Sequence, residues 1–222
     1  MTINSIIGQK ERTQTRVIGT IGWQCATLPI MARTKEFDPD AALHAALELF
    51  WRQGYEATSM QDLVDHVGVN RASLYATYGS KHDLYLRALD RYCELRGTET
   101  MTALNRPGPA LDAVRDFVHS YVTECREDAE RKGCLVTNTA TELLPRDAKA
   151  ARRVDIAFGE LEAALAGTLS RAQQEGDLPP DKDPRALARF LVTFIQGIRV
   201  VGKTDDIRRL DEAVDQALSL LA

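Results

Sequence analysis

Two short helices separated by a glycine, within residues 58–81, constrain the fold of this chain more than any other feature. The first helix is expected to end at Gly68, because glycine tolerates the positive φ of a helix C-terminus. Asn70 is a good N-cap for the second helix, which spans only residues 71–78. A helix of about two turns does not fold alone, so its neighbours must present it. The pattern predicts a helix-turn-helix.

Further cap residues place the flanking helices. Asp38 followed by proline predicts the start of a helix over residues 39–53. Thr58 is expected to cap the first helix of the pair, with Gln61 as its capping-box partner. Ser80 is expected to cap a longer helix after the pair. These helices together complete a small helical domain.

The rest of the chain also reads as helical. Strand signals are nearly absent beyond residue 37. Apolar periodicity predicts five more helices, at about 110–131, 135–144, 148–175, 184–201 and 206–221. The fold class is therefore all-α. It comprises an N-terminal three-helix helix-turn-helix domain over 38–96 and a C-terminal helical dimerisation and ligand-binding domain over 97–222, with Arg106–Pro109 as a linker.

Residues 1–37 show no helical periodicity. They are expected to be an extension that is either disordered or lies upstream of a natural start at Met31. A secretory signal is not expected, because charged residues near the start interrupt any apolar stretch, and no apolar run is long enough for a membrane helix. These features predict a cytoplasmic protein with no membrane partner.

The charge of the chain does not by itself indicate a nucleic-acid binder, because the formal net charge is −4. Any contact with DNA must therefore come from a local patch. The outward residues of the short helix suit such a patch, because Asn70, Arg71 and Ser73 can bond to base edges. Tyr75 and Lys81 suit phosphate oxygens. Leu74 and Tyr78 are expected to point back to the core.

The stretch Gly54–Leu63 with Val67–Lys81 resembles the TetR family of repressors, over roughly residues 39–90. In that family the third helix enters the major groove. The resemblance implies a DNA-contacting set of Thr58, Asn70, Arg71, Ala72, Ser73, Tyr75, Thr77 and Lys81. Thr77 stands where many members have His, which puts one phosphate contact in doubt. The alternative is a helix-turn-helix that serves only as a packing unit.

The C-terminal half carries a second resemblance. Residues 133–143 resemble a segment of the regulatory domain in one branch of the same family. Family members usually dimerise through their last two long helices, here about 184–201 and 206–221. The apolar face expected there consists of Phe190, Leu191, Phe194, Ile198 and Val201. The alternative is that this face belongs to the intramolecular core.

A ligand pocket is expected among the helices of 110–175, because such pockets are apolar and aromatic. The candidate lining residues are Phe117, Tyr121, Phe158 and Leu161, with Cys134 as a further candidate. Cys134 follows Arg131, Lys132 and Gly133 at a helix start, a setting that can activate a thiol as a redox or electrophile sensor. The alternative is a small buried hydrophobe.

The expected function is a ligand-responsive transcriptional repressor. It would bind a palindromic double-stranded DNA operator as a homodimer and be released by a small-molecule or reactive-species effector. Two alternatives are a non-enzymatic helical protein-interaction module and a thiol-based regulator acting through Cys134. An enzyme is not expected, because the sequence shows no catalytic triad, paired-carboxylate motif or phosphate loop. No cofactor is expected, and the spacing of His119, Cys125 and Cys134 matches no standard metal site.

Overall fold

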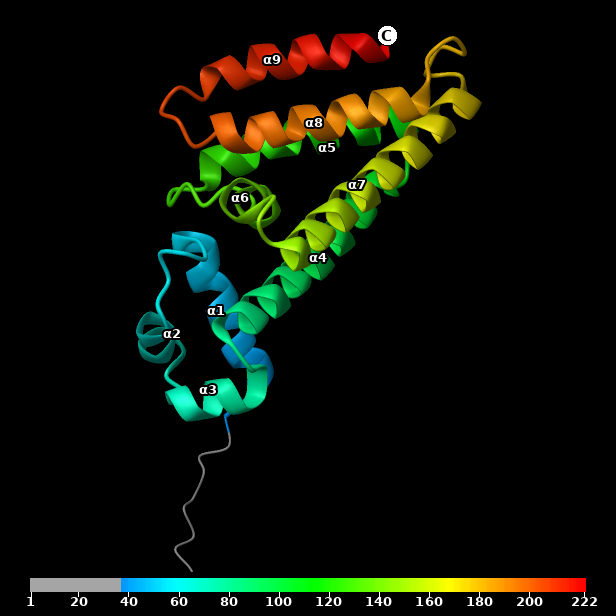
Figure 1. The fold of residues 1–222 in the computed structure, drawn as a ribbon. Coiled ribbons are helices and arrows are strands. Elements are labelled where there is room, and N and C mark those ends of the chain that lie inside the picture. The colour runs from blue at the N-terminus through cyan, green and yellow to red at the C-terminus, as the bar shows by residue number, and fades with distance from the viewer. Residues whose placement is uncertain (1–36) are drawn as a thin grey trace, which may run out of the picture. The chain divides into compact units, whose positions relative to one another are not determined.

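The computed structural model describes residues 37–222, and all regular structure in this range is helical (Figure 1). The predicted all-α class is confirmed. The N-terminal part consists of α1 (Pro39–Gln53), α2 (Met60–Val67), α3 (Arg71–Tyr78) and α4 (Lys81–Leu104). It is followed by α5 (Ala110–Glu127), α6 (Leu135–Leu143), α7 (Ala148–Glu175), α8 (Pro184–Val201), α9 (Arg208–Leu218) and the 3-10 turn η1 (Ser219–Leu221). The expected extension lies outside the described residues, apart from Phe37.

The predicted capping box of α2 is wrong by one residue. Ser59, not Thr58, is the N-cap, and its hydroxyl accepts from the backbone N of Asp62 at 3.1 Å. The Asp62 carboxylate accepts from the backbone N of Ser59 at 2.8 Å. This pairing is reciprocal, whereas the Thr58 hydroxyl points back toward α1 and donates to the carbonyl of Gly54 at 2.6 Å. Gly68 ends α2 with a φ of 72°, as predicted.

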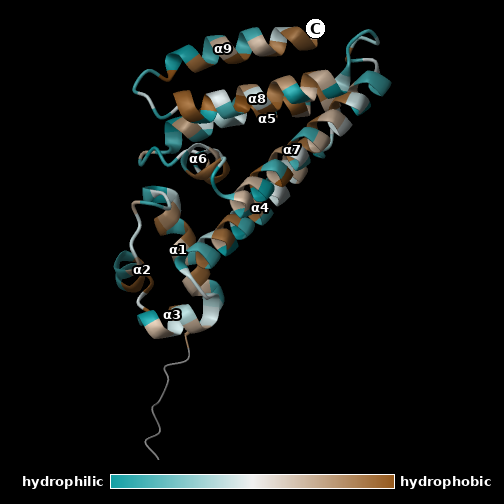
Figure 2. Ribbon diagram, in the orientation of Figure 1, coloured by the Kyte–Doolittle hydropathy of each residue, from teal (hydrophilic) through white to brown (hydrophobic). Residues whose placement is uncertain are grey.

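The buried apolar side chains of the described residues form two cores. The first is built from α1 to α4 together with α6 and the start of α7. The second is built from α5, α8, α9 and the later turns of α7. Phe158 of α7 packs against both cores. Figure 2 shows the amphipathic character of these helices, with brown hydrophobic residues beside teal hydrophilic ones.

The long helix α4 connects the two cores. It leaves the α1–α3 group and runs alongside α7 (Figure 1). The domain boundary expected at residue 96 therefore falls inside a continuous helix and not at a break in the chain. Both α1 and α3 pack on α4, so this helix contacts the helix-turn-helix as well as α7.

Three C-terminal expectations need correction. The helix α5 ends at Glu127 instead of residue 131, and α9 begins at Arg208 instead of 206. Leu191 and Ile198 were expected on a dimer face, but both are buried in the core of their own chain. They share the inward side of α8 with Ile195, because positions 191, 195 and 198 fall on one helix face.

In the part of the chain that the structure covers, none of the helices combines the length and apolarity that crossing a membrane requires.

Candidate DNA-binding face and effector cavity

The short helix α3 is held by its neighbours through two buried side chains. Leu74 and Tyr78 are 1% and 5% exposed, and both belong to the core formed with α1, α2 and α4. The Tyr78 hydroxyl donates to the carbonyl of Pro39 at the start of α1, at 2.5 Å. Asn70 caps the helix by accepting from the backbone N of Ser73 at 2.9 Å. These contacts present α3 as a rigid element.

The opposite side of α3 faces solvent. Arg71, Ala72 and Tyr75 are exposed, and Ser73 and Thr77 are partly exposed. No acidic residue occurs between Gly68 and Lys81. The structure therefore places six of the eight proposed DNA contacts, Asn70 among them, on α3 or at its N-cap, and α3 itself carries no acidic residue despite the negative net charge of the chain.

Two cations among the proposed DNA contacts, one on α3 and one at the start of α4, are already oriented. One terminal nitrogen of Arg71 donates to Gln61 Oε1 of α2 at 3.1 Å. Lys81, the first residue of α4, lies 4.3 Å from the centroid of the Tyr55 ring. Arg71 has N–H donors left besides the one that Gln61 accepts, and the Lys81 ammonium keeps its three donors, so both groups can still bind an anion.

Thr58 does not belong to this surface. Its side chain is 0% exposed, and its hydroxyl is used by the Gly54 carbonyl. A side-chain contact from Thr58 to DNA is therefore excluded in this conformation. Its contribution is to hold the turn between α1 and α2, which positions the start of α2.

A cavity of about 500 Å³ lies among α4, α5, α7, α8 and the start of α6. Four of the five proposed ligand contacts line it, namely Tyr121, Cys134, Phe158 and Leu161. The fifth, Phe117, does not. Its ring is buried in the C-terminal core and meets the Tyr121 ring edge-on, with centroids 5.1 Å apart. It supports the cavity wall from behind.

Two guanidinium groups share one carboxylate at the cavity. Arg199 of α8 is 6% exposed, and its Nη1 lies 2.7 Å from Glu124 Oε2 on α5. Arg96 of α4 donates from Nη2 to both oxygens of Glu124, at 3.0 and 3.1 Å. Arg199 also lies over the Tyr121 ring, 4.4 Å from its centroid. Three helices are therefore joined by charged groups at the cavity.

Tyr92 of α4 has a buried hydroxyl that finds no hydrogen-bond partner among the described residues. Burial raises the pKa of Tyr92 well above 10, so the hydroxyl keeps its proton and remains a donor. Its ring packs edge-on against Trp51 of α1, with centroids 5.1 Å apart. Tyr92 thus contacts both the cavity and the helix-turn-helix.

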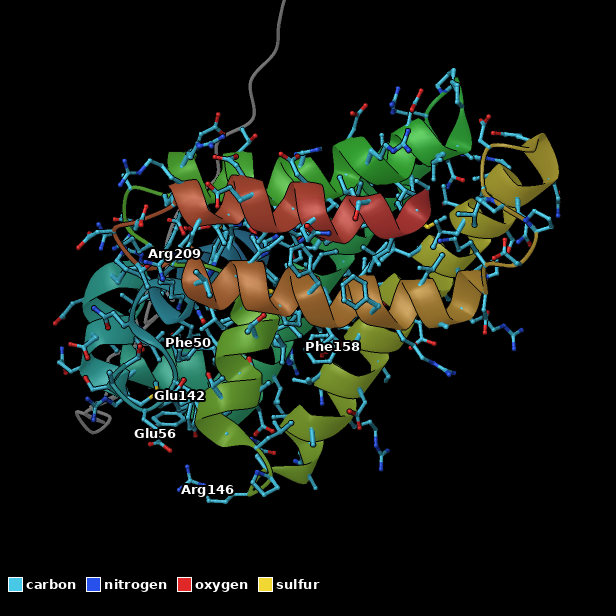
Figure 3. The ribbon with its side chains drawn as sticks, turned by 90° about the horizontal axis from the view of Figure 1, so that it is seen from above. Phe50, Glu56, Glu142, Arg146, Phe158 and Arg209 are labelled. Atoms are coloured by element: carbon cyan, nitrogen blue, oxygen red, sulfur yellow. The ribbon has the colours of Figure 1, made fainter. Side chains whose placement is uncertain are left out.

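Two further contacts join the cavity wall to the helix-turn-helix. Trp51 Nε1 donates to the carbonyl of Gly133, the residue before Cys134, at 2.9 Å. At the other end of α6, the Glu142 carboxylate accepts from the backbone N of Tyr55 at 3.0 Å and of Glu56 at 2.7 Å. Figure 3 shows Glu142 and Glu56 close together at this junction. The segment 133–142 therefore spans from the cavity to the turn that precedes α2.

The cavity also contains two thiols. Cys134 stands at the N-cap of α6 and is partly exposed, and Cys93 lies on α4. Burial raises the pKa of Cys93 to about 12, which leaves it unreactive near neutral pH. Within residues 37–222 no group of His, Cys, Asp or Glu side chains is arranged to hold a metal ion.

Comparisons with known proteins agree with this geometry. Residues 42–88 match the family described as bacterial regulatory proteins, tetR family, and residues 110–218 match the tetracyclin repressor-like C-terminal domain. The HTH-type transcriptional regulator YezE of Bacillus subtilis is 40% identical over 193 residues, which cover 86% of this chain and 100% of that protein. The chain belongs to the TetR family.

Other TetR relatives support the same assignment. The HTH-type transcriptional repressor ComR of Escherichia coli is 32% identical over 169 residues, covering 76% of this chain and 80% of that protein. A solved structure of the TetR family regulator CifR superposes with a TM-score of 0.75 at 29% identity, covering 84% of this chain and 98% of that one. The chain is thus a transcriptional regulator with a DNA-binding helix-turn-helix, and its family is one of regulators and not of enzymes.

The sequence does not predict several residues that line the cavity or connect it to the helix-turn-helix. Arg199 interrupts the apolar stripe of α8 directly after Ile198, and a charge at such a position could have indicated a buried ion pair. Tyr92 and Arg96 are four residues apart on α4, which places them on one face. Glu142 gave no such signal, because its two partners are backbone amides far away in sequence.

Proposed function

We propose that this chain is a ligand-controlled repressor that binds a palindromic operator as a homodimer and leaves it when an effector fills the cavity. The observation that carries the proposal is the solvent-facing side of α3, a helix without acidic residues in a TetR-type helix-turn-helix. Its DNA contacts are Asn70, Arg71, Ala72, Ser73, Tyr75, Thr77 and Lys81. Small and polar side chains there let the backbone approach the major groove.

Operator binding is supported by a structural relative. The CifR protein that superposes on this chain was solved in complex with a 26-bp double-strand operator DNA. By analogy, the operator of this chain would hold two half-sites that are about 34–36 Å apart or a multiple of that spacing, because dimeric helix-turn-helix proteins read successive major grooves.

Dimerisation is supported by the outer face of α8. The Phe190 and Phe194 rings stack there, with centroids 6.0 Å apart and planes 10° apart. Phe190 and Val200 remain 40% and 51% exposed. An aromatic, apolar helix face of this kind is typical of a subunit interface.

Control by an effector is supported by the contacts between cavity and helix-turn-helix. A ligand that moves the Tyr92 ring acts directly on Trp51 of α1. A shift of α6 is transmitted at both ends, through the Gly133 carbonyl and through Glu142. The ligand needs only to bind better to the arrangement in which the two α3 helices no longer match the operator.

The proposal is tested with the DNA upstream of the chain's own gene. Fluorescence anisotropy should show saturable binding with two chains per duplex, and unrelated duplexes of equal length should compete poorly. Raising the salt concentration should weaken binding steeply, because phosphate contacts release counterions. One chain per duplex, or equal affinity for every duplex, would contradict the proposal.

A second candidate is release by a reactive species that modifies Cys134. It is supported by the position of Cys134 in the cavity wall, one residue from the Gly133 carbonyl that binds Trp51. The solved CifR chains also carry substitutions at cysteines. Treatment with an electrophile should lower the operator affinity of the native chain and leave that of Cys134→Ser unchanged. Equal responses of the two proteins would rule out Cys134.

A further inference from the structure

We propose that the cavity selects small apolar molecules that carry a carboxylate, and that the carboxylate oxygens bind between the Tyr92 hydroxyl and the Arg199 guanidinium. The proposal rests on the proposed function in one respect, since it takes this cavity to be the effector site. It adds the chemical class of the effector.

The most deeply buried polar group with unused capacity at the cavity is the Tyr92 hydroxyl, which can donate. The buried Tyr92 hydroxyl is without a partner in the described chain, which is costly unless a ligand supplies an acceptor. The Gln196 amide also lines the cavity, but its oxygen accepts from Thr137 at 2.7 Å and its nitrogen donates to the carbonyl of Val192 at 3.2 Å. A ligand acceptor beside Tyr92 would therefore satisfy the deepest unpaired polar group of the cavity, whereas the acceptors left for a ligand donor, Thr100 and Glu160, are partly or fully exposed.

The charges at the cavity also favour an anion. Arg96 has two ion-pair partners: it donates to Glu99 at 2.8 Å and to Glu124 at 3.0 Å. The more deeply buried Arg199 has Glu124 as its ion-pair partner, and Glu124 is already shared with Arg96. A buried cation is stabilised by further anionic partners. Glu160, which also lies at the cavity rim, is exposed on α7 and can remain solvated.

The remaining wall suits an apolar body. Val136, Phe158, Leu161 and Ile195 are apolar side chains of the cavity lining. A volume of about 500 Å³ falls in the range of small-molecule sites. The forked guanidinium of Arg199 can hold two carboxylate oxygens, which neither an alcohol nor an amide can match.

The test uses two probe series on the full-length protein without DNA. One series is 4-phenylbutanoate, 4-phenylbutanamide and 4-phenylbutan-1-ol, and the other is octanoate, octanamide and octan-1-ol. In isothermal titration calorimetry, at least one carboxylate should bind about tenfold or more tightly than its own amide and alcohol. If both carboxylates bind no better than their neutral counterparts, or fail to bind at millimolar concentration, the proposal is wrong.

Variants then locate the carboxylate. Tyr92→Phe removes a hydroxyl that has no partner, so its urea midpoint should not fall, whereas the carboxylate affinity should fall about tenfold. Arg199→Gln should abolish the preference for carboxylate over alcohol, and Arg199→Lys should retain part of it. The surface variant Arg115→Gln is the control. An unchanged carboxylate affinity in Tyr92→Phe contradicts the docking site, even if Arg199→Gln does not fold.

The same probes separate this inference from the proposed function. The ligand class is judged from binding to the free protein, and ligand control is judged from operator affinity in the presence of a bound carboxylate. A carboxylate that binds with the predicted preference but leaves the operator affinity unchanged would contradict ligand control and leave the ligand class standing.

Discussion

Thr58 shows how one hydroxyl can serve structure where sequence similarity suggests DNA contact. The residue matches a family position, yet its side chain is buried and donates to the Gly54 carbonyl. We expect Thr58→Val to lower the free energy of unfolding by about 1 to 2 kcal/mol, because the buried carbonyl loses its donor. Urea denaturation measures this loss. The exposed Thr123→Val is the control, and equal midpoints for the two variants would contradict the assignment.

The thiol of Cys93 should react slowly although it lines the cavity. Because burial raises its pKa to about 12, only about one molecule in 10⁴ carries the thiolate at pH 8. Alkylation by iodoacetamide should therefore be roughly 10³-fold slower than for a free thiol, and its rate should rise about tenfold per pH unit up to pH 10. Mass spectrometry of the digested protein follows the rate. Alkylation at the rate of a free thiol would show that the site is open.

At the residue scale, the sequence predicts whether a side chain is buried or exposed better than it predicts which other side chains it contacts. The outward residues of α3 follow from helical periodicity, and so do Leu74 and Tyr78 on its inner side. Phe117 satisfies the same periodicity but lies behind the cavity wall, because periodicity identifies a buried face and not what that face encloses. Arg199 and Glu124 meet only after three helices have packed.

The helix α6 is the element that joins the cavity to the helix-turn-helix, and Glu142 makes its distal contact. Glu142→Gln removes the charge and one of the two acceptor oxygens that bind the amides of Tyr55 and Glu56. We expect hydrogen exchange at these two amides to become about tenfold faster or more, which corresponds to about 1.4 kcal/mol of local opening.

The control for this prediction is Glu127→Gln, which removes an exposed carboxylate at the end of α5. If the two variants exchange at the same rate at Tyr55 and Glu56, Glu142 does not hold the turn.

At the element scale, the caps and glycines carry most of the information. Asn70 with Gly79 delimits α3, and Asp147 with Gly176 delimits α7, because each cap satisfies end groups locally. The end of α5 was placed too late because charged residues after Glu127 continue the helical pattern in sequence. In the structure, Asp128 turns away to accept from the backbone N of Gly133 at 2.7 Å. Such a contact spans a loop and leaves no periodic signal.

At the scale of the whole molecule, the proposed dimer depends on the outer face of α8. We expect the double variant Phe190→Asp, Phe194→Asp to be monomeric under conditions in which the native chain is a dimer, because two charges would have to be buried in the interface. Sedimentation equilibrium distinguishes the two states. Ile156→Asp, at an apolar side chain of α7 that is 53% exposed, is the control and should stay dimeric. A dimeric double variant would place the interface elsewhere.

The central claim is that the outward face of α3 reads DNA, and operator affinity tests it most directly. The double variant Arg71→Ala, Tyr75→Ala keeps the buried side of α3 intact, so its urea midpoint should match that of the native chain. Arg208→Ala, at a side chain of α9 that is 94% exposed, is the charge control. We predict that fluorescence anisotropy at moderate salt will show operator affinity reduced about 10- to 1,000-fold in the double variant and unchanged in the control. An unchanged affinity in a folded double variant would contradict the claim.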